Sequence, residues 1–244
     1  MEIQEILRGC VVEDKVVKLP EGQLDRKLYQ QVAKSLTGIG GKWKGGKVMG
    51  FVFLSDPTKL LAEIAGGKQI NLKKEFQFFG TPYNLAEKMV DLVGILPEDR
   101  VLEPSAGQGA IIKALNALHG VVPDCFELME QNRIILSESG LKFNLVGEDF
   151  LKCTEYYDVI VANPPFTKNQ DIDHIRKMYD CLAYGGRLIS ISSRSWVEGS
   201  QKRQKEFRQW LDILGASTWD IPEGTFKESG TMVGAVLVSI IKNT

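Results

Sequence analysis

Short apolar runs alternate with amphipathic stretches over the last two thirds of the chain. The runs predict strands at residues 100–103, 121–128, 143–146, 159–162, 187–192, 217–221 and 234–241. Between most of them, apolar positions at helical spacing predict helices at residues 81–93, 110–118, 132–139, 171–183 and 202–214. This alternation is typical of an α/β fold, here a doubly wound, seven-stranded, mostly parallel sheet. The last two strands have no helix between them and are expected to form an antiparallel hairpin.

The beginning of the chain follows a different pattern. It predicts a helix, a glycine-rich loop, a strand and a second helix, at residues 23–36, 38–46, 48–53 and 57–65. Asp56 is expected to cap the second helix, with Pro57 at its first position. Thr81 is expected to cap the first helix of the α/β region. We therefore expect a small α+β unit at residues 1–77 and the larger domain at residues 78–244.

Composition excludes several classes of protein. Hydrophobic residues make up 43% and charged residues 25% of the 244 residues, an ordinary soluble balance. There is no apolar stretch of roughly 18 residues and no signal-peptide pattern, so no membrane association is expected. Four scattered cysteines without a C-x-x-C pair are typical of reduced thiols in a cytoplasmic protein. Only two histidines occur, without metal-ligand spacing, so no metal site is expected.

Charge is unevenly distributed along the chain. Ten Lys and Arg residues against three acids give residues 26–75 a net charge of +7, which leaves −8 elsewhere in a chain of net −1. This indicates a polyanionic partner for the N-terminal unit. Within it, Lys42, Trp43 and Lys44 interleave cations with an aromatic ring, a pattern that suits phosphates and a stacked base. The alternative is a solvated loop with Trp43 tucked into a small core.

The most informative motif follows the predicted strand at residues 157–162. There the chain reads Asn163-Pro164-Pro165-Phe166. Neither proline can donate an N–H, so strand pairing stops and nearby carbonyl groups can face a ligand. With the Asn163 amide oxygen they form a cluster of acceptors beside an aromatic ring. Such a cluster suits a planar amine, for example the exocyclic amino group of a nucleobase. The alternative is a strand-ending turn with Asn163 as a local cap.

Acidic residues follow three successive predicted strands. Glu103 opens the loop Glu103-Pro104-Ser105-Ala106-Gly107-Gln108-Gly109, which lacks the dinucleotide and phosphate-loop signatures and favours a cationic ligand. Its glycines permit close approach of the backbone to a ligand, or serve only strand-to-helix packing.

The next two acids suit a nucleoside. Glu127 can accept both hydroxyls of a ribose, and Asp149 can accept from an adenine amino group while Phe150 or a neighbour packs on the ring. Taken singly, Glu127 could be a solvated acid and Asp149 a helix cap.

These motifs in this order resemble the amino-group methyltransferases that use S-adenosylmethionine. The chain looks most like the N6-adenine DNA methyltransferases in which the cofactor half precedes the catalytic half, over residues 78–241. The resemblance implies a class I, Rossmann-like methyltransferase fold. It also implies cofactor contacts from Thr81, Pro82, Glu103, Ser105, Ala106, Gly107, Gly109, Glu127, Asp149, Phe150 and Asn163.

The resemblance also assigns roles. Glu103 and the glycines would surround the methionine part of the cofactor, and Thr81 and Pro82 would contact its carboxylate. The catalytic residues would be Asn163, Pro164, Pro165 and Phe166. Asn163 and the Pro164 carbonyl would accept both hydrogens of the target amino group, and Phe166 would stack on the base.

One departure from that family concerns target recognition. Only about 78 residues follow Phe166, and the sheet needs most of them. Recognition must come from the basic N-terminal unit, from loops at residues 167–170 and 193–203, or from a partner chain. The nucleic-acid candidates are Lys42, Trp43, Lys44, Lys168, Arg194 and Trp196. The segment Gly224–Thr231 is expected to be a hairpin loop, with Phe226 near the target base or in the core.

The function expected from these residues is methylation of adenine N6 in DNA. An RNA adenine-N6 or guanine-N2 methyltransferase shares the same acceptor motif and stays open. A nucleic-acid-binding subunit that keeps the fold without catalysis is the alternative of a different class. The basic N-terminal unit argues against a protein-glutamine methyltransferase.

Overall fold

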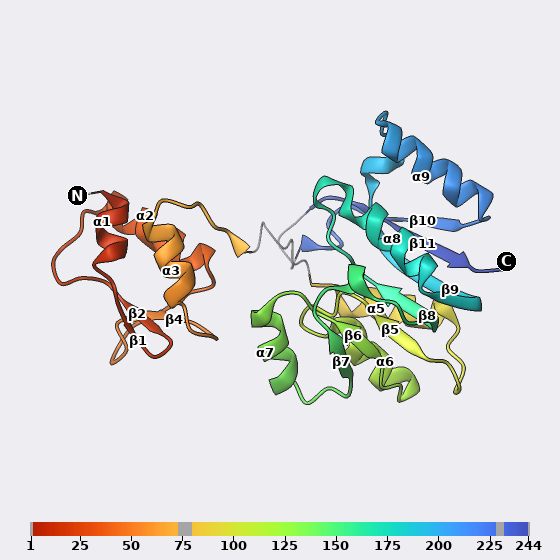
Figure 1. The fold of residues 1–244 in the computed structure, drawn as a ribbon, viewed down its shortest axis with the longest axis horizontal. Helices are drawn as coiled ribbons and strands as arrows, with labels where there is room; N and C mark the ends of the chain where they lie inside the picture. Colours follow the sequence, from red (N-terminus) through yellow and green to blue (C-terminus); the bar gives the residue numbers. More distant parts are fainter. Residues whose placement is uncertain (1, 73–79, 228–231, 244) are drawn as a thin grey trace. The chain divides into compact units, whose positions relative to one another are not determined.

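The computed structural model describes residues 2–72, 80–227 and 232–243. The chain divides into two compact units, residues 1–77 and 78–244 (Figure 1). Each unit is described by itself. Lys73, Lys74 and Glu75, which contribute to the predicted basic span, lie outside the described residues, as does the segment 228–231 of the predicted hairpin loop.

The first unit is a small α+β fold, as predicted. Its elements are α1 (Ile3–Arg8), β1 (Val11–Glu13), β2 (Val16–Lys18), α2 (Arg26–Gly38), β3 (Lys42–Lys44), β4 (Gly50–Val52) and α3 (Thr58–Ala65). The strands form an antiparallel sheet in the order β1-β2-β4-β3. Its core joins residues of all three helices to Val17 and Phe51 of the sheet. Val17 and Phe51 are partners on neighbouring strands, so their side chains point to the same face of the sheet. All three helices pack on that face.

Three details of this unit differ from the sequence prediction. The segment Lys42–Lys44, predicted as loop, is the edge strand β3. Helix α1 and the hairpin β1–β2 were not predicted, because each strand has only three residues and the turn between them places Asp14, not glycine, at positive φ. Asp56 does accept from the Thr58 amide at 2.9 Å, but Pro57 occupies the N-cap position, one residue later than predicted.

The second unit contains the predicted seven-stranded sheet. Its strands are β5 (Val101–Glu103), β6 (Asp124–Phe126), β7 (Asn144–Gly147), β8 (Tyr157–Ala162), β9 (Leu182–Ser193), β10 (Ser217–Ile221) and β11 (Ala235–Ile241). The order is β10-β11-β9-β8-β5-β6-β7. Strands β5 to β9 are parallel, and β11 pairs antiparallel with both β9 and β10. The expected terminal hairpin is thereby confirmed.

Helices cover both faces of this sheet (Figure 1). They are α5 (Tyr83–Val93), α6 (Ala110–His119), α7 (Glu130–Glu138), α8 (Gln170–Asp180) and α9 (Lys202–Ile213). Successive side chains of a strand point to opposite faces, so Ile160 of β8 packs with α8 and α9, whereas Val159 and Val161 pack with α5 and α6. The doubly wound architecture follows from these two cores.

Some helices and strands begin or end at other residues than the hydrophobic pattern predicts. Strand β6 starts only at Asp124, because Pro123 has no N–H to donate to a ladder. Strand β9 is longer than predicted and runs through Gly185 and Gly186, which were expected only to stop the preceding helix. Helix α5 begins at Tyr83, and Thr81 does not cap it.

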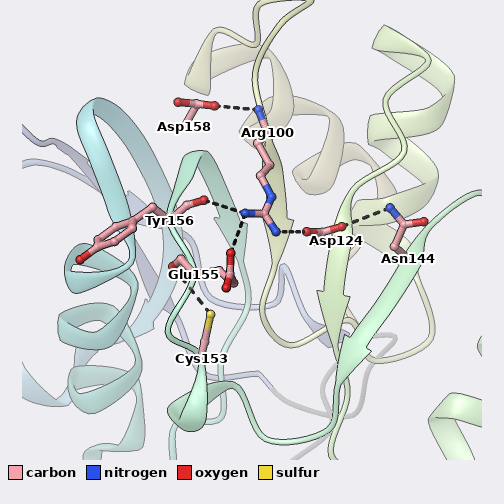
Figure 2. A network of polar contacts seen from close by, with 7 residues as sticks. All are labelled: Arg100, Asp124, Asn144, Cys153, Glu155, Tyr156 and Asp158. Atoms are coloured by element: carbon pink, nitrogen blue, oxygen red, sulfur yellow. Dashed lines mark hydrogen bonds and ion pairs between the residues drawn. The ribbon is translucent and has the colours of Figure 1, made fainter.

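A polar network ties the strands together at the edge opposite the ends where ligands bind in such sheets (Figure 2). The Arg100 guanidinium donates to Asp124 at 2.9 Å, to Glu155 at 3.2 Å and to the Tyr156 carbonyl at 3.3 Å. Its backbone N–H donates to Asp158 at 2.8 Å. Because these partners lie at or before the starts of β6 and β8, one residue fixes three neighbouring strands.

Replacing Arg100 with alanine should therefore destabilise the fold. We expect a loss of about 1–3 kcal/mol in the free energy of unfolding, since hydrogen bonds to a charged group are lost and Asp124 loses its cationic partner. Urea unfolding measures it. Lys205→Ala, which removes an exposed cation of α9, is the control. Equal free energies of unfolding for the two variants would mean that the network does not contribute to stability.

Candidate active site

The predicted cofactor and acceptor residues lie at the carboxyl ends of four neighbouring strands. Glu103 ends β5, Glu127 follows β6, Asp149 follows β7 and Asn163 follows β8. These strands are adjacent in the order β8-β5-β6-β7 and run parallel, so their carboxyl ends share one edge. This is the edge at which open α/β sheets bind ligands.

The loop after β5 is tied to the next strand by its backbone. The Ala106 N–H donates to the Phe126 carbonyl at 2.9 Å, and the Gly107 N–H donates to the Glu127 carboxylate at 2.6 Å. Gly107 and Gly109 have positive φ values of 56° and 86°. A Cβ atom on Gly109 would come within 2.5 Å of Leu141. The positive φ favours glycine there, and a side chain would also require Leu141 to move.

Two carboxyl groups are buried at this loop. Glu103 is 1% and Glu127 6% exposed, and neither forms an ion pair with a lysine or arginine of the described chain. Burial, with a smaller contribution from the nearby Glu127, raises the pKa of Glu103 to about 8, although the Ser105 N–H donates to it at 3.1 Å. Two buried carboxyl groups without a basic partner suit a cationic or hydrogen-donating ligand.

Burial also raises the pKa of Glu127. Three donors oppose that shift: the backbone N–H groups of Met129 at 2.7 Å and Gly107, and the Asn132 amide at 3.3 Å. The sequence reasoning missed Met129 and Asn132, which hold this carboxylate in place. The only feature of the sequence that could have indicated Met129 and Asn132 is that they follow Glu127 within a few residues.

The acceptor motif is connected to the start of α5. The Asn163 amide nitrogen donates to the Thr81 hydroxyl at 3.1 Å, across 82 positions of sequence. Thr81 thus orients Asn163 rather than capping α5, which corrects the predicted cap. The bond orients the Asn163 amide with its nitrogen toward Thr81, and the Oδ1 atom is the acceptor of the same amide. Pro164 is buried, and Phe166 packs half-buried against the core on the α5 and α6 side.

Asp149 serves partly as a cap. Its carboxylate accepts from the Leu151 N–H at 3.1 Å, at the start of the 3₁₀ turn Phe150–Lys152, and lies 3.4 Å from the Lys152 ammonium. About a third of its side chain is exposed, so it remains accessible to a ligand. The exposed side chains of Leu128 and Leu151, which follow Glu127 and Asp149 closely, are apolar neighbours that the sequence reasoning did not single out.

The structure corrects the role predicted for Phe150. Its ring is 2% exposed and packs between Phe126 and His174, with ring centroids 5.8 and 5.9 Å away. A ring buried on both sides supports the Asp149 turn from the core and does not offer a face to a cofactor. Sequence alone could not separate these roles, since an aromatic residue after a strand suits either.

A cavity of about 610 Å³ lies near but not at this site. Its lining includes Arg100, Phe126, Leu128, Asp149 and Tyr157. Only Asp149 belongs to the predicted cofactor set, and none of the acceptor residues takes part. The site is therefore defined by converging strand ends and not by this cavity.

Two nucleic-acid candidates of the second unit are engaged within the protein. Trp196 is 5% exposed, donates from Nε1 to Ser192 at 2.7 Å and packs on Phe207, so it belongs to the core. Arg194 pairs with Asp220 at 2.6 Å. Lys168 is exposed on the turn that follows Phe166. Phe226 is buried in the core, the second of the two roles considered for it.

The candidates of the first unit do not share a face. Neighbouring residues of a strand alternate in direction, so Trp43 of β3 points to the face opposite Lys42 and Lys44. Trp43 packs edge-on against Phe51 and Tyr29, with centroids 5.2 and 6.4 Å away, and stays 45% exposed. Lys42 and Lys44 point away from the helices. One surface therefore does not present all three side chains, and their role in nucleic-acid binding stays a prediction.

Other sites were sought in the same residues. No group of three or more His, Cys, Asp and Glu side chains within the described ranges could hold a metal ion. None of the described helices is long and apolar enough to cross a membrane. All four cysteines are free thiols.

Comparison with known proteins places the fold. No protein-family model matches the chain. The type II restriction enzyme and methyltransferase RM.BcgI of Heyndrickxia coagulans is 28% identical over 159 residues, covering 51% of this chain. The chain spans about a quarter of that relative's length.

Solved structures share the architecture at low identity. The M protein of the type I restriction enzyme EcoKI superposes with a TM-score of 0.55 at 16% identity, over 91% of this chain and 52% of its own. A Pyrococcus horikoshii protein thought to be an RNA methyltransferase gives 0.52 at 17% identity, over 71% of this chain and 92% of its own. The predicted fold class is confirmed. In its fold, the chain is therefore similar to the class I S-adenosylmethionine-dependent methyltransferases.

Proposed function

We propose that the chain binds S-adenosylmethionine and transfers its methyl group to the N6 amino group of adenine in DNA. The observation that carries this proposal is the convergence of Glu103, Glu127 and Asp149 with the Asn163 amide at one edge of the sheet. At this edge, acids that suit a cationic nucleoside lie next to an acceptor group that suits a planar amine.

The cofactor half fits the ligand in charge and in space. S-adenosylmethionine supplies an electrophilic methyl group on a positively charged sulfonium. Glu103, buried and without a basic partner in the described ranges, lies where such a cation gains most. Gly107 and Gly109 open the backbone for close approach. Glu127, held by three donors, presents a fixed carboxylate to the ribose hydroxyls.

The acceptor half would activate the amine by orientation. The Asn163 Oδ1 atom and the Pro164 carbonyl accept the two amino hydrogens, which pulls the nitrogen toward a tetrahedral shape and localises its lone pair. No strong base is needed, because the amine loses its proton after attack. Catalysis then depends on positioning and on fixed dipoles. A base within a duplex must flip out to reach these groups.

DNA is favoured by the relative and by the basic first unit. The sequence relative is a restriction enzyme and methyltransferase, and EcoKI M belongs to a restriction enzyme. An RNA substrate is the second candidate, favoured by the fold shared with the Pyrococcus horikoshii protein. Tritiated methyl transfer to DNA and RNA pools, followed by nucleoside analysis, decides between them. Calorimetry without heat on addition of S-adenosylmethionine would reject the proposal altogether.

Asn163→Ala should lower methyl transfer at least about a hundredfold, since a positioned hydrogen-bonding group is lost. The dissociation constant for S-adenosylmethionine, measured by calorimetry, should stay within about twofold. Asn163→Asp, which keeps an acceptor oxygen at the same place, should retain more activity than the alanine variant. Parallel loss of transfer and cofactor binding would show that Asn163 is only structural.

Glu103→Gln should stabilise the protein at alkaline pH while weakening cofactor binding. The folded-state pKa of about 8 lies above the ordinary value of 4.5, so wild-type stability falls as the pH rises from about 4.5 to 8. Glutamine carries no charge to desolvate. The variant should gain on the order of 1–3 kcal/mol over the wild type at pH 8.5 and little at pH 4.5.

Thermal and urea unfolding at both pH values measure this difference, and calorimetry measures the cofactor affinity. Glu138→Gln, at an exposed position of α7, is the control and should change neither. A Glu103→Gln variant with unchanged stability at pH 8.5 and unchanged cofactor affinity would remove Glu103 from the site.

The first unit is proposed to contact the nucleic-acid backbone through Lys42 and Lys44, on the sheet face that the helices leave uncovered. Replacing both with alanine should lower the slope of log K against log salt by up to about 1.8 for duplex DNA. Replacing Lys27 and Lys34, exposed on α2, makes the same charge change on the helical side. Indistinguishable slopes for the two double variants would place the contact elsewhere.

A further inference from the structure

The turn directly after the acceptor motif has a costly backbone conformation. Lys168 and Asn169 are consecutive non-glycine residues at positive φ, with φ/ψ of 54°/30° and 59°/36°. L-residues seldom adopt this left-handed region, and two in succession persist only when their surroundings impose it. Such strain is typical of functional sites.

Side chains of a distant segment clamp this turn. The Asn169 Oδ1 atom accepts from the Ser195 hydroxyl at 2.8 Å and from the Gln204 amide at 3.4 Å. The Arg203 guanidinium donates to the Asn169 carbonyl at 2.8 Å and to the Lys168 carbonyl at 3.5 Å. The Asn169 side chain is thus bonded to η3 (Arg194–Trp196) and to the first turn of α9, and the backbone carbonyls of the turn are bonded to α9.

A buried layer anchors the clamp to the core. Asp171, fully buried in the first turn of α8, accepts from the Ser192 hydroxyl at 2.7 Å and from the Ser193 N–H at 2.8 Å. Ser192 also accepts from Trp196. Because these bonds join α8 to the end of β9, the segments on either side of the turn cannot separate without breaking buried polar contacts.

The strained turn leaves one cation facing solvent. Lys168 is exposed and has no acidic partner among the described residues. The neighbouring cations are occupied, since Arg203 pairs with Asp173 at 2.5 Å and Arg194 pairs with Asp220. Lys168 is two residues along the chain from Phe166, so the α-carbons of the two residues lie at most about 7 Å apart. A rigid backbone thereby presents a single charge beside the acceptor site.

We propose that Lys168 binds a backbone phosphate of the strand that carries the target base, in the position that the strained turn fixes. This inference rests on the proposed function, in that the acceptor is taken to be a nucleotide. A lysine ammonium is a compact charge suited to a phosphate oxygen, and its fixed origin beside Phe166 would set the register of the strand.

The test uses the full chain with S-adenosylhomocysteine and fluorescein-labelled oligonucleotides of DNA and of RNA, single-stranded and duplex. Lys168→Ala should weaken binding on the order of tenfold at low salt, as expected for one charge-assisted contact. The slope of log K against log salt should fall by about 0.7 for single strands and 0.9 for duplex DNA. Lys168→Arg should restore most of the affinity. Lys205→Ala, the matched control on α9, should bind as the wild type does.

A second pair of variants tests the strain. Both Asn169→Gly and Asn169→Ala lose the side-chain bonds to Ser195 and Gln204, but only glycine keeps easy access to the left-handed conformation. Asn169→Ala should weaken oligonucleotide binding more than Asn169→Gly, and it should add little once Lys168 is already alanine. Circular dichroism checks that each variant is folded, and calorimetry checks that each binds S-adenosylmethionine.

The outcomes separate this inference from the proposed function. Lys168→Ala and Lys205→Ala with equal affinities and equal slopes would overturn it, even with methyl transfer intact. A chain that binds S-adenosylmethionine but no oligonucleotide would overturn it too, and would leave the methyltransferase standing with another amine as substrate. Absence of cofactor binding would reject the proposed function, while the oligonucleotide slopes would still decide the role of Lys168. The DNA and RNA arms show which polymer supplies the phosphate.

Discussion

Two carboxyl groups buried at neighbouring strand ends set the terms for the rest of the site. Glu103 and Glu127 are nearly inaccessible, burial raises the pKa of both, and the nearby Glu127 adds to the shift at Glu103. Backbone N–H groups of the glycine loop and of the turn after β6 offset part of that cost. These donors are available only if the loop turns tightly enough to aim them inward. The glycine conformation, the short link to α6 and the register of β5 beside β6 are all conditions for holding two acids without a cation.

The Thr81–Asn163 hydrogen bond connects the two chemical halves of the site. Thr81 precedes α5, at the start of the cofactor half, and Asn163 lies beyond β8. The prolines after Asn163 end the strand, so the hydrogen bonds of the sheet do not continue past this residue. The Thr81 hydroxyl, 82 positions earlier in the chain, accepts from the Asn163 amide and helps to fix its orientation. The position of the acceptor amide therefore depends on the docking of α5 against the sheet.

Much of this arrangement could be predicted from the sequence, because it depends on local signals. Periodicity revealed the seven strands, and parallel order then placed Glu103, Glu127, Asp149 and Asn163 at one edge. What could not be predicted depends on partners remote in sequence. The apolar character of Phe150 and Trp196 is equally compatible with a core and with a ligand face, and only packing against Phe126 and Phe207 decides for the core. Likewise, a loop rich in glycine gave no sign that Lys42–Lys44 would pair with β4.

The strained turn and the buried acids share one property. Each holds a group in a conformation or charge state that is unfavourable in isolation, and each relies on surrounding bonds to hold it there. The Asp171 carboxylate accepts from residues at the end of β9. The Glu127 carboxylate accepts from the loop after β5 and from the start of α7. The Arg100 network joins β5, β6 and β8 at their opposite ends. Because the same three strands carry Glu103, Glu127 and Asn163 at their carboxyl ends, the spacing of these groups depends on how the strands are fixed along their whole length.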